Sequence, residues 1–307
     1  MKLHLAARPP FSFRAVADSH GWRQLAPFAG DADGLSYIAR LSTGRVTELH
    51  LGAAPDGAQI ECADPVTDEE QVEIATMADW MLALDQDLSA FYVAAQHEPK
   101  LADVAERAQG RLLRSPTLFE DVVKTILTTN TTWSGTIRMV QALVDLFGDP
   151  LGDLSSGPLG GLSSGPLSTD PVCRAFPLPK SIAQADVETL RQEARLGYRA
   201  PYVLELARRI DSGTLDLEAL KTAELPTDEL RKRLRAIKGV GPYAAANLLM
   251  LLGHYDTIPI DSWALTLVAK EWHGGSAIGP AEVEAAFARW GQFKGLAYWF
   301  WDWSATG

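Results

Sequence analysis

The sequence contains little cysteine. Of its 307 residues only Cys62 and Cys173 are cysteines, too few for a disulfide framework or for the four thiolates of an iron–sulfur cluster. The six histidines show no metal-ligand spacing. We therefore expect no iron–sulfur cluster and no required cofactor.

Long apolar runs are also missing. No stretch reaches the roughly eighteen consecutive apolar residues that suggest a membrane-spanning helix. Residues 1–13 lack the apolar core of a secretory signal, because Arg8, Pro9 and Pro10 interrupt them. We therefore expect a cytoplasmic protein without a membrane partner.

Positively charged residues are fewer than negatively charged ones, and the net charge is −11. Residues 1–100 carry 7 Lys+Arg against 15 Asp+Glu, so the remainder of the chain is nearly neutral. An acidic balance argues at first against a nucleic-acid partner. A local basic cluster lies within residues 231–238, although a solvated helix face is the ordinary explanation of such a cluster. Its members are Arg231, Lys232, Arg233, Arg235 and Lys238.

The hydrophobic pattern changes along the chain. Residues 35–52 (LSYIARLSTGRVTELHLG) alternate between apolar and polar, with a hairpin turn at Ser42-Thr43-Gly44. From Thr67, where Glu70 completes a capping box, the period becomes helical, and the expected helices include 100–109 and 181–194. The sequence predicts an α+β fold, with an antiparallel β domain at 1–75 and a helical domain at 76–307.

Residues 148–170 differ from the rest in composition. They are rich in Gly, Ser and Pro, and LSSGPL occurs twice, at 154–159 and 162–167. Such a composition cannot bury a core. We expect a flexible surface insertion between helices.

Two helices flank the segment Lys238-Gly239-Val240-Gly241, and Pro242 suits the first position of the second helix. Glycine tolerates positive φ and lets the backbone approach a partner closely. Amides at a helix N-terminus also suit a phosphate oxygen. Taken alone, the segment is better explained by an ordinary helix–turn–helix corner.

An acidic residue, Asp261, follows the apolar loop 257–260 (TIPI) and opens the next helix. Asp is a favoured helix N-cap, which would explain an isolated Asp here. The order hairpin, helix, loop and Asp is more specific, and it resembles the helix-hairpin-helix DNA glycosylase superfamily. Two further strings, residues 108–132 (AQGRLLRSPTLFEDVVKTILTTNTT) and 196–203 (LGYRAPYV), resemble its 8-oxoguanine DNA glycosylases.

The resemblance spans about residues 75–300 and also points to 3-methyladenine DNA glycosylase II. It implies a mostly α-helical HhH-GPD glycosylase fold beside an N-terminal antiparallel β-sheet. The implied partner is double-stranded DNA that contains a damaged base, and the implied state is a monomer. The damaged nucleotide would leave the duplex, because a stacked base is inaccessible to chemistry.

The resemblance also implies site residues. Asp261 matches the essential Asp, whose carboxylate stabilises positive charge on the sugar as the N-glycosidic bond breaks. The other matches are hairpin DNA contacts at Lys238, Gly239, Val240 and Gly241; a gap-filling Asn130; a wedge Tyr198; an Arg199 that reads the orphaned base; a base pocket of Tyr243, Trp263, Tyr298 and Asp302; and a monovalent cation on the carbonyls of Arg235, Ile237 and Val240.

Departures from the family pattern narrow the reaction. Tyr243 stands where bifunctional members have the Schiff-base lysine, so we expect a monofunctional enzyme. Gly135 stands where a second orphan-reading Arg is expected, which weakens the case for selection of cytosine. The aromatic run at 298–303 suits a cationic alkylated purine such as 3-methyladenine. An 8-oxoguanine DNA glycosylase without lyase activity, a catalytically inactive DNA-binding module and a plain helical interaction protein are the alternatives.

Overall fold

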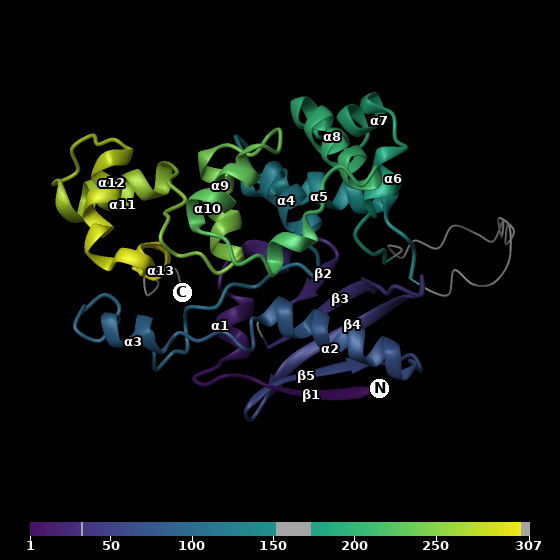
Figure 1. Cartoon of the computed structure of the whole chain (residues 1–307), viewed down its shortest axis with the longest axis horizontal. Coiled ribbons are helices and arrows are strands. Elements are labelled where there is room, and N and C mark those ends of the chain that lie inside the picture. The colour runs from purple at the N-terminus through teal and green to yellow at the C-terminus, as the bar shows by residue number, and fades with distance from the viewer. Residues whose placement is uncertain (32, 152–172, 302–307) are drawn as a thin grey trace, which may run out of the picture.

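The computed structural model describes residues 1–31, 33–151 and 173–301. A β-sheet lies on one side and most helices on the other, which confirms the expected α+β fold (Figure 1). The expected insertion at 148–170 falls largely outside the described residues, and so does Asp302. Within the described ranges, no helix has the length and apolar character to cross a membrane.

The sheet is antiparallel with strand order β1-β5-β4-β3-β2. Its strands are β1 (Lys2–Ala6), β2 (Phe28–Gly30), β3 (Gly34–Arg40), β4 (Val46–Ala54) and β5 (Gly57–Cys62). The expected hairpin joins β3 to β4, and Gly44 takes a φ of +91° there. The alternating pattern puts Leu49 and Leu51 of β4 into the core.

Helices surround and follow the sheet. The first part of the chain holds α1 (Phe13–Ala17), the 3-10 helix η1 (Gly21–Gln24), α2 (Asp68–Leu82) and α3 (Ser89–Ala95). The helical body holds α4 (Leu118–Thr128), α5 (Trp133–Phe147), α6 (Pro179–Ala183), α7 (Val187–Gln192), η2 (Gly197–Arg199), α8 (Ala200–Asp211), η3 (Glu218–Lys221), α9 (Thr227–Arg235), α10 (Pro242–Leu251), α11 (Ser262–Trp272), α12 (Pro280–Phe287), η4 (Ala288–Phe293) and α13 (Lys294–Phe300).

Two helix predictions were wrong. Residues 101–108 form successive turns rather than a helix, and the last of them, Ala108, has a left-handed φ of 51°. The periodic apolar side chains Leu101 and Val104 are nevertheless buried. The helix expected at 181–194 is two helices, α6 and α7, because the Asp186 carboxylate caps a new start by accepting from the Glu188 amide at 3.0 Å.

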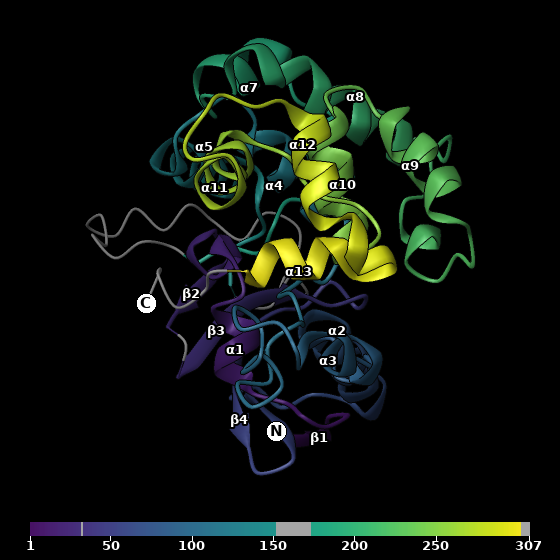
Figure 2. The ribbon, with the colours of Figure 1, turned by 90° about the vertical axis from the view of Figure 1, so that its left-hand side faces the viewer.

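One core joins the two parts of the chain. Buried apolar side chains form a continuous cluster from Phe13 to Trp301. The boundary expected at residue 75 falls within α2, and Ile74 and Ala78 of that helix belong to this cluster. Helix α13 lies between the sheet side and the helical body (Figure 2).

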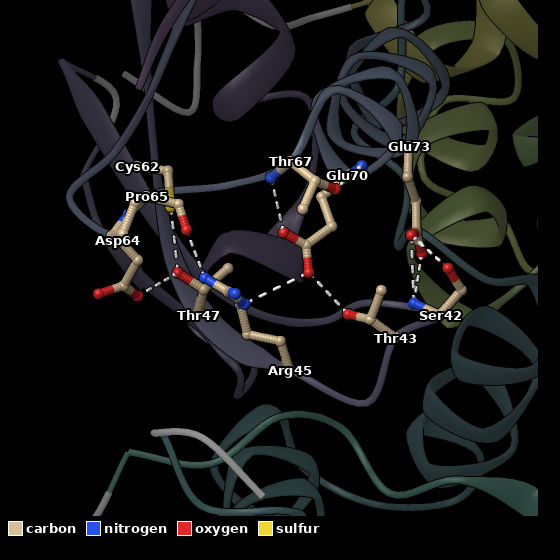
Figure 3. A network of polar contacts seen from close by, with 10 residues as sticks. All are labelled: Ser42, Thr43, Arg45, Thr47, Cys62, Asp64, Pro65, Thr67, Glu70 and Glu73. Atoms are coloured by element: carbon tan, nitrogen blue, oxygen red, sulfur yellow. Dashed lines mark hydrogen bonds and ion pairs between the residues drawn. The ribbon is translucent and has the colours of Figure 1, made fainter. Parts of the chain in front are cut away.

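Helix α2 is fastened to the β3–β4 hairpin by a buried carboxylate (Figure 3). Glu70, 1% exposed, accepts from the Thr67 amide at 3.0 Å and from the Thr43 hydroxyl at 2.7 Å. Its carboxylate also pairs with Arg45 at 3.3 Å. The capping box expected from the sequence is confirmed, and the same side chain ties the helix to the sheet.

Replacing Glu70 should therefore destabilise the fold. Glu70→Ala removes the half of the capping box in which Glu70 accepts from the Thr67 amide, and it leaves Arg45 and Thr43 without this partner. We therefore expect a loss of about 1–3 kcal/mol in the free energy of unfolding. Urea unfolding monitored by circular dichroism measures it. The matched control is Glu69→Ala, an exposed first-turn acid, which should change the value by less than about 0.5 kcal/mol. Equal effects of the two substitutions would contradict the assignment.

Candidate active site

Helix α4 carries three charged side chains into the core. Glu120, Asp121 and Lys124 are each at most 1% exposed. Lys124 Nζ lies 2.6 Å from Glu120, which also accepts from the Tyr37 hydroxyl at 2.7 Å. Burial, followed by the Glu120 charge, raises the pKa of Tyr37. The charges of Glu120 and Lys124 thus offset one another inside the protein, and Tyr37 on β3 connects the sheet to α4.

Residues 19–22 are held against the helical body by their polar atoms. The Trp22 indole donates to Asp121 Oδ1 at 2.7 Å. His20 Nε2 lies 2.7 Å from the Leu113 carbonyl, so this nitrogen carries the proton. The Trp299 indole donates to the Ser19 carbonyl at 2.9 Å. Burial lowers the pKa of His20 to about 4, so His20 is neutral at physiological pH.

These contacts form one wall of a cavity of about 290 Å³. Asp261 reaches it from the start of α11, and Tyr243 reaches it from α10. Helices α4 and α5 supply mostly threonines, and α13 supplies Trp299. The lining residues are His20, Gly21, Trp22, Leu112, Thr125, Thr128, Thr131, Trp133, Thr136, Tyr243, Asn247, Met250, Leu251, Asp261 and Trp299.

Asp261 is both a helix cap and a cavity residue. Its Oδ1 accepts from the Ala264 amide at 2.9 Å, which orients the carboxylate at the N-terminus of α11. The phenols of Tyr243 and Tyr298 lie within the electrostatic reach of this carboxylate. Burial raises the pKa of both phenols, and the Asp261 charge raises them further. Both phenols are therefore neutral and can act as donors beside Asp261.

An indole stacks over a glycine at the edge of the cavity. The Trp133 indole donates to Gln24 Oε1 at 2.7 Å. A Cβ on Gly21 would lie 2.2 Å from the Trp133 ring, so only glycine permits this approach. Trp133 remains 37% exposed. The geometry leaves an aromatic face at the entrance, between α5 and η1.

The turn after α4 presents an asparagine to solvent. Asn130 has a left-handed φ of 49°, and its side-chain amide donates to the Tyr198 hydroxyl at 3.2 Å. Arg199, 6% exposed, donates to the Asn130 carbonyl at 3.2 Å and to that of Thr129. Its guanidinium also lies 4.5 Å from the centre of the Tyr198 ring. Arg199 therefore holds the turn in place instead of extending into solvent.

The glycines of the hairpin serve different purposes. Gly239 has a φ of +90°, and a Cβ there would lie 2.8 Å from the Tyr202 ring. Gly241 has an ordinary φ of −82° and open space around it, so it leaves the start of α10 accessible. Val240 is buried, and its amide donates to the Ile237 carbonyl at 3.0 Å. Lys238 is exposed and pairs with Glu205 at 3.1 Å.

The structure brings part of the expected base pocket together. Asp261 and Tyr243 line the cavity, and Tyr298 is buried beside Asp261. Trp263 does not line the cavity and is 57% exposed, so the expectation that it forms the pocket is not met in the free protein. Trp299, next to the expected Tyr298, lines the cavity instead.

The sequence did not predict that residues 20–22, from the N-terminal part of the chain, line the cavity. The missed lining residues share no motif, because contacts between distant segments bring them together. Only the aromatic run at 298–303 gave a signal for one of them. They include His20, Gly21, Trp22, Trp133, Asn247 and Trp299.

The chain belongs to the HhH-GPD superfamily of base excision DNA repair proteins, whose family model matches residues 123–292. The fold is similar to a 3-methyladenine DNA glycosylase from Archaeoglobus fulgidus, with a TM-score of 0.73 and 19% identity, covering 99% of this chain and 98% of that one. It is also similar to an 8-oxoguanine glycosylase/lyase from Clostridium acetobutylicum in complex with DNA, with a TM-score of 0.70 and 18% identity over 96% and 92% of the two chains.

Two proteins of Bacillus subtilis are related in sequence. One, a DNA-3-methyladenine glycosylase, is 26% identical over 203 residues, which is 66% of this chain and 61% of that protein. The other, YfjP, provisionally named a DNA-3-methyladenine glycosylase, is 33% identical over 86 residues, which is 28% of this chain. The matched regions span 61% and 29% of the lengths of these relatives.

The acid that holds Trp22 should make stability depend on pH. Burial raises the pKa of Asp121 to about 6, above its value of about 3.9 in an unfolded chain. Between about pH 4 and 6 the folded protein therefore binds more protons, and ionisation of Asp121 lowers the free energy of unfolding as pH rises. Asp121→Asn cannot ionise and keeps an acceptor for Trp22. Its free energy of unfolding relative to wild type should rise across this window by on the order of 1–3 kcal/mol.

Urea unfolding at intervals from about pH 4 to 7 tests this expectation. Asp145→Asn, on the exposed face of α5, is the control and should follow the wild-type pH profile. A constant difference between Asp121→Asn and wild type at every pH would rule out the raised pKa.

Proposed function

We propose that this protein is a monofunctional DNA glycosylase that hydrolyses the N-glycosidic bond of a damaged purine flipped out of double-stranded DNA. The observation that carries the proposal is the cap-oriented carboxylate of Asp261 at a cavity of about 290 Å³ with tryptophan walls. A base must leave the stack to reach such a cavity. An inactive binding module would need an acceptor to cap α11, but it would need neither the cavity nor a negative charge in it.

The carboxylate is suited to stabilise an oxocarbenium-like sugar. The Ala264 amide fixes one oxygen of Asp261, which leaves the other oxygen for the developing charge or for an attacking water. Because their raised pKa values keep Tyr243 and Tyr298 neutral, neither phenol adds a second negative charge beside Asp261. A fixed charge in a partly desolvated site interacts more strongly than the same charge in water.

The lysines of the described chain do not offer a Schiff-base nucleophile at this site. No lysine lines the cavity in the described part of the chain. Lys124 lies nearby on α4, but it is fully buried and its ammonium is bound to Glu120 at 2.6 Å. A charged, inaccessible amine cannot attack a sugar carbon. We therefore infer hydrolysis without β-lyase cleavage.

The walls favour a cationic alkylated purine such as 3-methyladenine. Trp22, Trp133 and Trp299 offer ring faces or edges, and a cation gains from a ring face beyond ordinary stacking. His20 is neutral, so it does not repel a positively charged base. A neutral oxidised base such as 8-oxoguanine gains nothing from either feature. It remains the alternative substrate because of the glycosylase/lyase among the similar folds.

DNA would approach along the hairpin and the Asn130 turn. The hairpin offers backbone amides near Gly241, and Lys238 could exchange Glu205 for a phosphate. Asn130 would enter the gap left by the flipped nucleotide, with Tyr198 beside it as the wedge. Arg199 would affect recognition of the orphaned base indirectly, because it donates to the carbonyls of Thr129 and Asn130 and so positions the turn beside that base.

A monovalent cation fits the carbonyls that close α9. Those of Arg235 and Val240 accept no backbone N–H in the described structure, and that of Ile237 accepts one. Carbonyl oxygens suit a hard cation, which would bridge the hairpin to a DNA phosphate. In the described ranges, no group of three or more His, Cys, Asp or Glu side chains could hold a metal ion.

Asp261→Asn should abolish base release and preserve the fold. Asn caps helices as well as Asp does, so α11 should form normally, while loss of the charge should slow release by at least about 100-fold. The assay uses duplexes that each contain one lesion: a stable 3-methyladenine analogue, 8-oxoguanine, hypoxanthine or uracil. Methylated genomic DNA is added as a broad alkylation substrate. Strand breaks are read with and without hot alkali.

Breaks that need alkali, and that disappear in the variant, are the expected outcome. Breaks without alkali, together with a borohydride-trapped adduct, would contradict the monofunctional assignment. Intact binding of duplex DNA with no release from any lesion would identify an inactive binding module instead.

Trp133→Leu tests the preference for cationic bases. Loss of one aromatic face removes about 0.5–2 kcal/mol of cation–π attraction, which is about 2–30-fold in rate. Release of 7-methylguanine should fall by this factor relative to release of neutral hypoxanthine. Trp263→Leu, an exposed tryptophan outside the cavity, is the matched control and should leave the ratio unchanged. An equal loss for both bases in Trp133→Leu would contradict the cation preference.

A further inference from the structure

A second hollow lies on the other side of the Asn130 turn. It encloses about 520 Å³ and is lined by Thr131, Gly135, Arg138, Met139, Arg195 and Arg199. We call it the arginine hollow. Thr131 lines both this hollow and the cavity that contains Asp261, so the turn separates the two.

The charge of the arginine hollow is unusual for this chain. The protein has a net charge of −11, and its arginines often pair with carboxylates, as Arg191 does with Glu188 on neighbouring α7. Arg138 and Arg195 are exposed, and neither forms an ion pair with another described residue. Two unpaired guanidinium groups around one hollow favour an anionic ligand.

The third arginine of the hollow is already engaged. Arg199 is 6% exposed, and its Nη2 donates to the carbonyls of Thr129 and Asn130. Its Nη1 lies 3.9 Å from the Met139 sulfur. Because these nitrogens are already engaged, the Arg199 guanidinium has no free pair of N–H donors for the edge of a base. The long, exposed side chains of Arg138 and Arg195 are free to reach a phosphate.

The position of the Asn130 turn indicates which DNA strand passes the arginine hollow. If a nucleotide enters the cavity with Asp261, the turn occupies its place in the duplex, and the complementary strand passes on the side of the arginine hollow. We propose that Arg138 and Arg195 bind phosphodiesters of the undamaged strand opposite the lesion. This inference rests on the proposed function. Contacts with phosphates position a protein on DNA without reading sequence, so binding should not depend on the base opposite the lesion.

Binding to a duplex with a stable abasic-site analogue tests the proposal without requiring catalysis. One duplex has all its phosphates. A second carries neutral methylphosphonates opposite the lesion on the undamaged strand, and a third carries them on the damaged strand. Wild type, the double variant Arg138→Ala/Arg195→Ala and the control Arg191→Ala are compared across salt concentrations and with each of the four bases opposite the lesion.

The double variant should bind the native duplex more weakly, and its slope of log affinity against log salt should become less negative by about 2, because each lost phosphate contact removes about 0.9 from the magnitude of the slope. The loss should be the same for all four opposite bases. Methylphosphonates on the undamaged strand should remove the difference from wild type, whereas those on the damaged strand should not. Arg191→Ala should behave as wild type.

Three results would overturn the proposal. One is an unchanged salt slope in the double variant. Another is a loss that depends on the opposite base, which would mean that the arginines read that base. The third is a difference that disappears only when the damaged strand is neutralised. Base release is measured separately, so a protein that binds the abasic duplex but releases no base would refute the glycosylase activity alone.

Discussion

The buried charges of α4 are the constraint on which the site depends. Ions in a protein interior cost several kcal/mol each unless they are paired and hydrogen-bonded. Glu120 and Lys124 pair with one another. Tyr37 of the sheet donates to Glu120, and Trp22 of η1 donates to Asp121. Displacing the β part would leave these groups without partners. The sheet therefore secures the helical body in a fixed position, and α4 leads directly to the Asn130 turn.

The hydrogen bonds between the N-terminal part of the chain and the helical body also hold the tryptophans that line the cavity. Trp22 reaches Asp121 with its indole nitrogen and presents its ring to the cavity, so one side chain serves both the core and the site. Trp299 does the same through the Ser19 carbonyl. A wall built in this way is rigid, because each ring is held at its polar end. Rigid walls reduce the entropy lost when a base binds.

The sequence predicted elements and motifs better than it predicted the cavity. The capping box, the hairpin turn and the order of hairpin and Asp261 are local patterns with a local physical cause, and the first two appear in the structure as expected. Trp133 and Gly21 are in contact although they lie 112 positions apart in the sequence, and no periodicity encodes such a contact. Trp263 matched a family position, but its side chain is 57% exposed because Ala264, Leu267 and Val268 form the buried face of α11.

The double role of Asp261 limits which substitutions this position can tolerate. The position must supply an acceptor that begins α11, and in the proposed reaction it must also supply a negative charge. A descendant that kept its hold on DNA but lost the chemistry would still need the helix, so replacement by Asn, Ser or Thr would be tolerated where Ala or Leu would not. Loss of function at this residue would leave a well-folded DNA-binding protein rather than an unstable one.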